Sequence, residues 1–291
     1  MSNRAALYIV ATPIGNLEDL TPRAQRVLAE VALIAAEDTR HSGKLLQHFH
    51  ITTPLTALHE HNEREQVPLL IERLRNGESL ALLSDAGTPL VSDPGYHLVR
   101  AAHEAGHPVV PLPGACAAVT ALSAAGLPTD RFAFEGFPPA KSAARRRYYE
   151  SLRAEPRTLV FYESPHRIVE SLADMADVFG ADREAVVARE LTKQFETIRP
   201  GPLGGLAEWV RSDGQQQKGE FVLIVHGAEA TGADSAAEGA RILRVLLDEL
   251  PLTQAVSLAA RLSGEARNRL YDLALSLQPG RSGTDKMPPG L

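Results

Sequence analysis

The chain has 291 residues, of which 44% are apolar and 23% are charged, and its formal net charge is −6. This balance supports buried cores and excludes a chain disordered throughout, and the length predicts about two domains. We expect neither a membrane span nor a secretory signal, because no apolar run is long enough for either. The single cysteine, Cys116, cannot form an internal disulfide, which favours a cytoplasmic location.

The first 125 residues alternate short apolar runs with helical patterns. Such alternation predicts an α/β domain with a mostly parallel sheet covered by helices. One helix begins at Thr21-Pro22, an N-cap followed by a first-turn proline, and is expected to run to Ala35. The other elements predicted here are strands at 7–11, 80–84 and 108–112 and helices at 64–75, 95–105 and 115–125.

A second α/β series follows a boundary expected near residues 126–128. Its strands are predicted at 131–135, 158–162, 185–188 and 220–226, and its helices at 142–153, 166–179 and 203–210. Residues 227–234 resemble a linker, 238–277 are helical in pattern, and the Gly/Pro-rich end favours disorder. We therefore predict α/β domains at 1–126 and 127–229, a helical domain at 237–278 and a disordered tail at 279–291.

The segment 84–95, SDAGTPLVSDPG, begins where an apolar strand ends. Ligands of open α/β sheets bind outside the carboxyl ends of the strands. Glycine allows the backbone to approach a ligand closely, and proline stiffens the loop. Asp85 and Asp93 can accept hydrogen bonds from a ligand or cap a turn. A tight structural turn is the alternative, but the length and position favour a ligand-binding loop.

Two other loops narrow the choice of ligand. Residues 112–118, LPGACAA, also follow a strand, and their small side chains leave room for a ligand or for close helix packing. Cys116 has no CxxC neighbour, so we expect no metal there. The first loop, TPIGN, lacks the GxGxxG pattern, and no GxxxxGK[ST] motif is present. Dinucleotide and P-loop sites are therefore disfavoured.

Four polar clusters follow predicted strands or apolar stretches: AEDTRH, HEHN, ESPHR and ARELTK. Any one of them fits a solvated loop with helix caps, but four at strand ends favour a functional site. The HEH spacing is a weak metal signal, so we expect hydrogen-bonding and substrate-positioning roles. The candidate proton acceptors are Glu37, Asp38, His59, Glu60, Glu163 and Glu190.

The sequence SDAGTPLVSDPG, followed by PLPGACAAVTALSAAGLP, resembles the paired loops of the tetrapyrrole-methylase superfamily. The motifs YIVATPIGN, HEHNE, FYESPHRI and GEFVLIVHG resemble its ribosomal-RNA-methylating branch, and the likeness extends to Leu277. The resemblance implies two α/β domains with S-adenosylmethionine in the cleft between them, plus the small C-terminal helical domain. The implied cofactor contacts are Pro13, Asp85, Gly87, Thr88, Val91, Cys116, Ala117, Tyr162, Ala188, Gly219 and Glu220. The wider superfamily has aspartate at the position of Thr88.

The RNA-methylating branch implies 2′-O-ribose methylation of a cytidine in the decoding region of small-subunit ribosomal RNA, by a homodimer and without metal. Alignment supplies a large share of such a rate and a general base a smaller one. Positive charge gathers at 139–153 and 241–281, although solvated helix faces are by themselves the better explanation of such runs. The expected RNA-binding residues are Arg40, Arg145, Arg146, Arg147, Arg167 and Arg189, because arginine offers phosphate a planar donor fork.

Three alternatives remain from the sequence. A methyltransferase acting on a tetrapyrrole ring would explain the two cofactor loops equally well. It would not explain the basic helical extension or the polar clusters. A module that senses the cofactor and binds RNA without catalysis is a second alternative. An NAD-linked oxidoreductase is the third, and the absence of GxGxxG counts against it.

Overall fold

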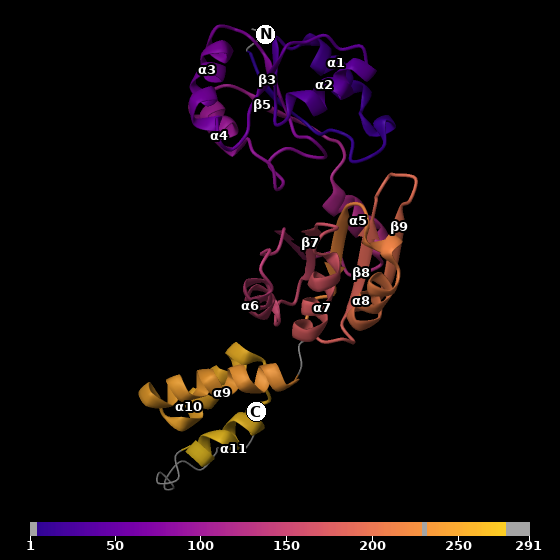
Figure 1. Cartoon of the computed structure of the whole chain (residues 1–291). Helices are drawn as coiled ribbons and strands as arrows, with labels where there is room; N and C mark the ends of the chain where they lie inside the picture. The colour runs from indigo at the N-terminus through magenta and orange to yellow at the C-terminus, as the bar shows by residue number, and fades with distance from the viewer. Residues whose placement is uncertain (1–4, 229–231, 278–291) are drawn as a thin grey trace. The chain divides into compact units, whose positions relative to one another are not determined.

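The computed structural model describes residues 5–228 and 232–277 (Figure 1). Backbone contacts divide the chain into two compact units, residues 1–227 and 228–291. The first unit holds two α/β sheets, and the described part of the second is helical. The predicted fold class is confirmed. The predicted domain boundaries stay predictions, and the tail predicted at 279–291 lies outside the described residues.

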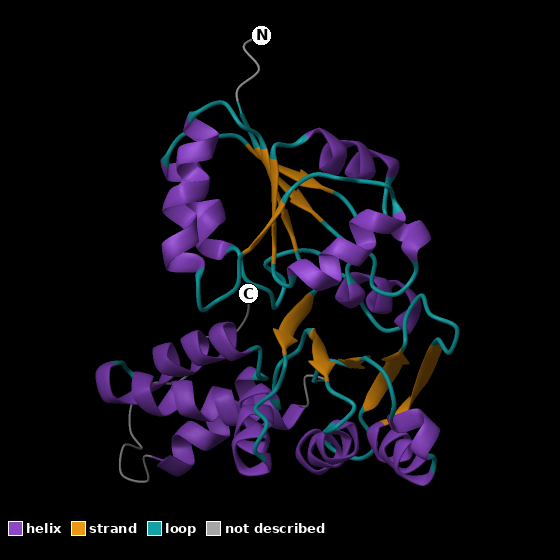
Figure 2. Cartoon of the chain, turned by 45° about the horizontal axis from the view of Figure 1, so that its top comes forward, coloured by secondary structure: helices purple, strands orange, loops and turns teal. Residues whose placement is uncertain are grey.

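The first sheet was predicted to be mostly parallel and is wholly parallel, with strand order β3-β2-β4-β1-β5. Its strands are β1 Leu7–Val10, β2 Leu33–Ala36, β3 Leu55–Ala57, β4 Leu80–Leu83 and β5 Val109–Leu112. Four helices cover both faces (Figure 2): α1 Pro22–Glu30, α2 Thr39–His48, α3 Glu63–Arg75 and α4 Tyr96–Glu104. Alternate residues of β4 serve the two faces: Ala81 and Leu83 pack toward α1 and α2, and Leu80 and Leu82 toward α3 and α4.

The helix predicted from Thr21 to Ala35 is correct only in its first half. The hydroxyl of Thr21 accepts a hydrogen bond from the Ala24 N–H at 3.1 Å, which confirms the N-cap. The helix ends at Glu30, however, and Leu33–Ala36 form β2. The run LIAA fits a buried helix or a buried strand equally well. Pairing with β3 and β4 on either side decides for the strand.

The second sheet is mixed, with order β6-β7-β10-β8-β9. Its strands are β6 Phe132–Gly136, β7 Thr158–Glu163, β8 Glu184–Arg189, β9 Thr197–Pro202 and β10 Phe221–Val225. Only β6 and β7 pair in parallel. The edge strand β9 (TIRPGP) was not predicted, because its two prolines are typical of loops as well as of sheet edges.

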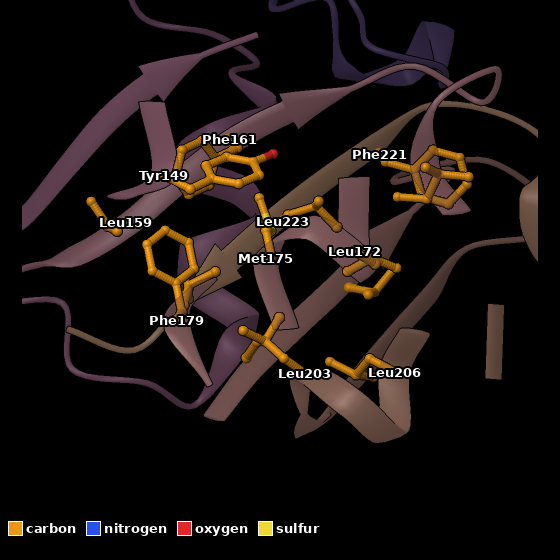
Figure 3. Packing of buried hydrophobic residues seen from close by; sticks show 14 of the residues in the cluster. Tyr149, Leu159, Phe161, Leu172, Met175, Phe179, Leu203, Leu206, Phe221 and Leu223 are labelled. Carbon is orange, nitrogen blue, oxygen red and sulfur yellow. The ribbon is translucent and has the colours of Figure 1, made fainter. Parts of the chain in front are cut away.

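Three helices pack on one face of this sheet: α6 Ser142–Leu152, α7 Ile168–Phe179 and α8 Leu203–Ser212. Figure 3 shows their side chains, including Tyr149 and Met175, against Phe161 of β7 and Leu223 of β10. On the other face lies α5 Ala117–Ala125, whose small side chains contact the strands closely. The helix that follows the last strand of the first sheet therefore packs on the second sheet.

The second unit contains α9 Gly232–Glu249, α10 Leu252–Ser263 and α11 Arg267–Leu277 around a small apolar core. The predicted linker at 227–234 is too long, because α9 already begins at Gly232. Alanine is the strongest helix former, and the alanines that follow favour an early start of the helix. Within the described residues, the helices are too short or too polar to span a bilayer.

Candidate active site

A cavity of about 380 Å³ lies in the first unit, where the strands of both sheets end. Its wall comes from the segments that follow β1, β2 and β4, from α5, and from the ends of β6, β7, β8 and β10. The lining residues are Ile14, Glu37, Asp85, Ala86, Gly87, Thr88, Val91, Ser92, Asp93, Ala117, Phe137, Tyr162, Glu163, Ser164, Pro165, Leu191, Glu220, Phe221 and Val222. This is the edge at which ligands of open α/β sheets bind.

Hydrogen bonds hold the segment 84–95 in place as one wall of the cavity. Gly87 and Thr12 exchange backbone hydrogen bonds at 2.9 and 3.0 Å, and the Thr12 hydroxyl donates to the Ser84 carbonyl at 3.1 Å. Gly87 has φ +82°, a conformation that strongly favours glycine. The Thr88 hydroxyl donates to the Ala115 carbonyl at 3.0 Å. The two loops singled out in the sequence are therefore joined to each other.

The same segment carries backbone strain. Leu90 and Ser92 have φ values of 72° and 66°, and neither is a glycine. Left-handed conformations of such residues cost roughly 1–2 kcal/mol each. Residues held in this way persist only where the surrounding structure over-determines them, and they gather at ligand sites. The strain therefore supports a functional role for this wall of the cavity.

Acidic side chains gather along one side of the cavity. The Asp85 carboxylate accepts a hydrogen bond from the Asp38 N–H at 3.1 Å, which ties the β2 and β4 loops together. Burial, and then the negative charges of Asp93 and Asp85, raise the pKa of Glu37. Burial also raises the pKa of Asp93 to about 6, with a further increase from Asp85 and an opposing hydrogen bond from Ser84. Asp93 thus changes charge close to neutral pH.

We expect Asp93→Asn to stabilise the chain in a pH-dependent way. The folded pKa of about 6 lies above the ordinary value of 3.8, so the stability due to the protonated form is present below pH 3.8 and lost as pH rises through 6. Asparagine does not ionise, so the variant avoids the loss of unfolding free energy that ionisation of Asp93 causes. That loss is about 1–3 kcal/mol after allowance for solvent screening. Denaturant unfolding between pH 4 and pH 8 should show the advantage of the variant growing up to pH 6. An advantage independent of pH would contradict the shifted pKa.

Glu163 and Tyr162 end β7 at the cavity. The Glu163 Oε1 accepts hydrogen bonds from the Ser164 N–H at 2.7 Å and from Arg167 Nη2 at 2.8 Å. Its Oε2 is buried and has no hydrogen-bond partner among the described residues. Burial, and then the proximity of Cys116, raise the pKa of Tyr162 to about 12, so its hydroxyl stays protonated. That hydroxyl accepts a hydrogen bond from the Ala118 N–H at 3.2 Å.

A second network of hydrogen bonds lies beside the cavity near the start of β10. The Glu190 carboxylate accepts from Lys193 Nζ at 2.9 Å and from the Glu220 N–H at 3.0 Å, and Lys193 also contacts Glu220 at 2.8 Å. Burial by itself would raise the pKa of Glu190, but these hydrogen bonds lower it. Gly219 has φ +92°, and a Cβ there would lie 2.4 Å from the Glu190 carboxyl group. Glu190 is therefore a structural anchor of this wall.

Of the predicted proton acceptors, the structure brings Glu37 and Glu163 to the cavity. Asp38 instead caps α2, where it accepts from the Arg40 N–H at 2.8 Å. The Glu60 side chain faces a neighbouring cavity that shares Asp93 with the first, and His59 lines neither.

The predicted cofactor contacts fall into two groups. Seven line the cavity: Asp85, Gly87, Thr88, Val91, Ala117, Tyr162 and Glu220. Four do not: Pro13, Cys116 and Gly219 are chain neighbours of lining residues, and Ala188 is buried in the core.

The sequence-based reasoning missed several lining residues. Ser92 lay inside the predicted loop, and Ser164 and Pro165 inside the cluster ESPHR, so those motifs could have identified them. Asp93, which the sequence had offered as a hydrogen-bond acceptor for a ligand, does line the cavity. Phe137 lay in none of the four polar clusters, although the motif RFAFEGFPP that contains it also resembles the family.

Burial corrects two of the predicted RNA-binding arginines. Arg145 is fully buried, and its guanidinium contacts Asp174 at 2.7 Å. Arg189 is also buried, and it donates to the backbone carbonyls of Lys218 and Phe195 at 3.0 and 3.3 Å. Helical patterns and charge cannot distinguish such side chains from exposed ones. Arg40, Arg146 and Arg147 are exposed, and Arg167 is partly exposed.

Comparisons with known proteins agree with this arrangement. A family model described as Tetrapyrrole (Corrin/Porphyrin) Methylases matches residues 6–207, and one described as RsmI C-terminal HTH domain matches residues 233–278. The ribosomal RNA small subunit methyltransferase I of Pseudomonas aeruginosa is 61% identical over 94% of this chain and 97% of its own. The enzyme of the same name from Escherichia coli O157:H7 is 56% identical over 95% and 97%.

Solved structures show a similar fold. Uroporphyrin-III C-methyltransferase from Thermus thermophilus has a TM-score of 0.53 and 25% identity, over 77% of this chain and 94% of its own. A diphthine synthase has a TM-score of 0.58 and 17% identity, over 77% and 90%. The second likeness concerns the fold alone.

Proposed function

The chain belongs to the tetrapyrrole methylase family, in its ribosomal RNA small subunit methyltransferase I group, and on this premise we propose that it methylates small-subunit ribosomal RNA with S-adenosylmethionine as the donor. The observation that carries the proposal is the extent of the likeness. It includes both sheets around the cavity and also the C-terminal helices, which a match to the methylase fold alone would leave out.

The walls of the cavity fit this donor, which supplies an electrophilic methyl group on a positively charged sulfonium. Five carboxylate side chains line the cavity, and they favour a cation over an anion: Glu37, Asp85, Asp93, Glu163 and Glu220. Gly87 and Ala117 leave space for the backbone to approach the donor closely. We propose that the seven lining residues from the predicted set hold the donor, with Pro13, Cys116, Ala188 and Gly219 supporting them from behind the wall.

The acceptor in this proposal is the 2′-hydroxyl of a cytidine in the decoding region. Its proton needs an acceptor that is ionised near neutral pH and lies in the cavity. Asp93 meets both conditions, and Glu37 is the member of the predicted set closest to doing so. We therefore assign proton acceptance to Asp93 with Glu37 beside it. Glu163 is instead engaged with Arg167.

The RNA surface in this proposal comprises Arg40, Arg146, Arg147 and Arg167 together with the C-terminal helices. Arginine forks suit phosphate oxygens, whereas the acidic cavity does not. Arg145 and Arg189 are left out because they are buried. A homodimer located in the cytoplasm completes the proposal.

Mapping the modified nucleotide tests the function directly. The purified chain is incubated with methyl-labelled S-adenosylmethionine and with small ribosomal subunits that lack the modification. Label is expected on the ribose of one decoding-region cytidine, and subunits that already carry the modification serve as the control. Label on a base, or no label at all, would refute the proposal. Transfer to a uroporphyrinogen offered in parallel would favour the tetrapyrrole alternative.

A further inference from the structure

Phe137 is an exposed aromatic side chain on the wall of the cavity. Just over half of its surface is accessible, 54%, although large apolar side chains are normally buried. Its ring lies edge-on to Tyr162, with the ring centres 5.5 Å apart. Tyr162 in turn contacts Phe134 at 4.9 Å. Phe137 thus ends a cluster of three edge-to-face rings, and the accessible part of its ring lies at the cavity.

The backbone around Phe137 is shaped to present this ring. The register between β6 and β7 shifts between Phe134 and Gly136, and Gly136 has φ +63°. Such bulges redirect a side chain and are common beside active sites. The next carbonyl, that of Pro138, accepts a hydrogen bond from Arg167 Nη1 at 3.4 Å. Arg167 is itself held by the buried carboxylate of Glu163 at 2.8 Å.

Charge limits what can lie against this ring. Among the described residues that line the cavity there are five carboxylates and no lysine or arginine. Phosphate groups are repelled from such a wall, so the part of an RNA chain that enters is the uncharged nucleoside. Aromatic side chains stack on unpaired bases in single-stranded RNA. The ring and the acidic wall together favour a flipped-out base on this side of the cavity.

We propose that Phe137 is the platform on which the base of the acceptor nucleotide stacks, with the Glu163–Arg167 pair as the positioning element that holds its loop. The inference rests on the proposed function and adds the residue that orients the acceptor. Stacking of the base aligns the attached ribose with the donor, so the ring acts on the acceptor and leaves donor binding unchanged. Stacked bases of this kind contribute roughly ten- to a hundredfold in affinity.

Four variants of the full chain test the platform: Phe137→Ala, Phe137→Leu, Phe137→Tyr and Phe132→Ala. Phe132 is the matched control, because it lies on β6 five residues before Phe137, is 42% exposed and does not line the cavity. Two quantities are measured: kcat/KM for unmodified small subunits, and the Kd of S-adenosylhomocysteine by calorimetry. Thermal unfolding checks that each variant is folded.

The alanine and leucine variants are expected to lose ten- to a hundredfold in kcat/KM, while Phe137→Tyr stays within threefold of the unsubstituted chain. The Kd of S-adenosylhomocysteine should change by less than twofold in all four. A Kd that rises in parallel with the loss of activity would overturn the proposal, because the ring would then serve the donor. Equal activity of Phe137→Ala and Phe132→Ala would overturn it too. Absence of transfer by the unsubstituted chain would instead refute the proposed function.

Discussion

Asp174→Ala is expected to lower the free energy of unfolding by about 3–5 kcal/mol, the usual result of removing one partner of a buried ion pair. The Asp174 carboxylate accepts from Arg145 Nε at 2.8 Å, and it also accepts from Ser142 and Arg146. Without it, the fully buried guanidinium of Arg145 keeps only a carbonyl and the distal carboxylate of Glu170 at 3.4 Å. The charge is then largely uncompensated.

The measurement uses the only tryptophan, Trp209 on α8, which packs against the same core as α6 and α7. Its fluorescence in urea reports unfolding of the second sheet. Asp177→Ala is the control, because Asp177 is exposed, pairs with the exposed Arg146, and should change stability by less than about 1 kcal/mol. Equal effects of the two variants would contradict the role given to the buried pair.

A double variant separates charge from packing. Replacing both Arg145 and Asp174 by apolar residues, Arg145→Met with Asp174→Leu, should restore most of the stability that Asp174→Ala loses. Because Arg145 is buried, the double variant should also bind small subunits as tightly as the unsubstituted chain. A loss of subunit binding in a folded double variant would show instead that Arg145 contributes to RNA binding.

Asp93→Asn is expected to lower kcat for methyl transfer at least a hundredfold, the lower end of the effect of a general base. In the unsubstituted chain, kcat should rise with pH through about 6, as Asp93 loses its proton, and level off above. The asparagine side chain of the variant does not ionise, so its kcat should show no such rise with pH. Single-turnover transfer to unmodified small subunits between pH 5.5 and pH 8 measures both the size and the pH dependence of the effect.

Asp85→Asn gives an independent check on Asp93. The negative charge of Asp85 raises the pKa of Asp93, so removing it should shift the pH profile of kcat to lower pH. Asp177→Asn is the matched control, because Asp177 does not line the cavity, and it should leave the profile unchanged. A variant Asp93→Asn that is more stable at pH 7 yet fully active would exclude Asp93 as the proton acceptor.

Much of the site was predictable because its residues follow strands. The carboxyl ends of parallel strands meet at one edge of a sheet, so the loops after β1, β2 and β4 had to converge. Glu37 and Asp85 were found in this way. The run LIAA was assigned to a helix instead of β2, because a short apolar run has no period of its own. The edge strand β9 was not predicted, because its two prolines are also typical of loops.

Local sequence patterns could not predict which charged side chains are buried. Arg145 and Arg147 stand two residues apart in one basic run, yet the first is enclosed by α7 and the second is exposed. Asp93 was visible in its loop, but its raised pKa depends on burial and on Asp85, which other parts of the fold determine. Phe137 lay outside the polar clusters, and the register shift and the Arg167 hydrogen bond that shape its loop depend on the fold.

By itself, the sequence determined the fold class, the two cofactor loops and the family, because strand patterns, glycine turns and ordered motifs are local properties of the chain. Only the tertiary structure decided which charges are enclosed, which carboxylate at the cavity has a raised pKa and which ring is left exposed there. Those properties depend on the distance between residues far apart in the chain and on the exclusion of water, neither of which a linear pattern contains.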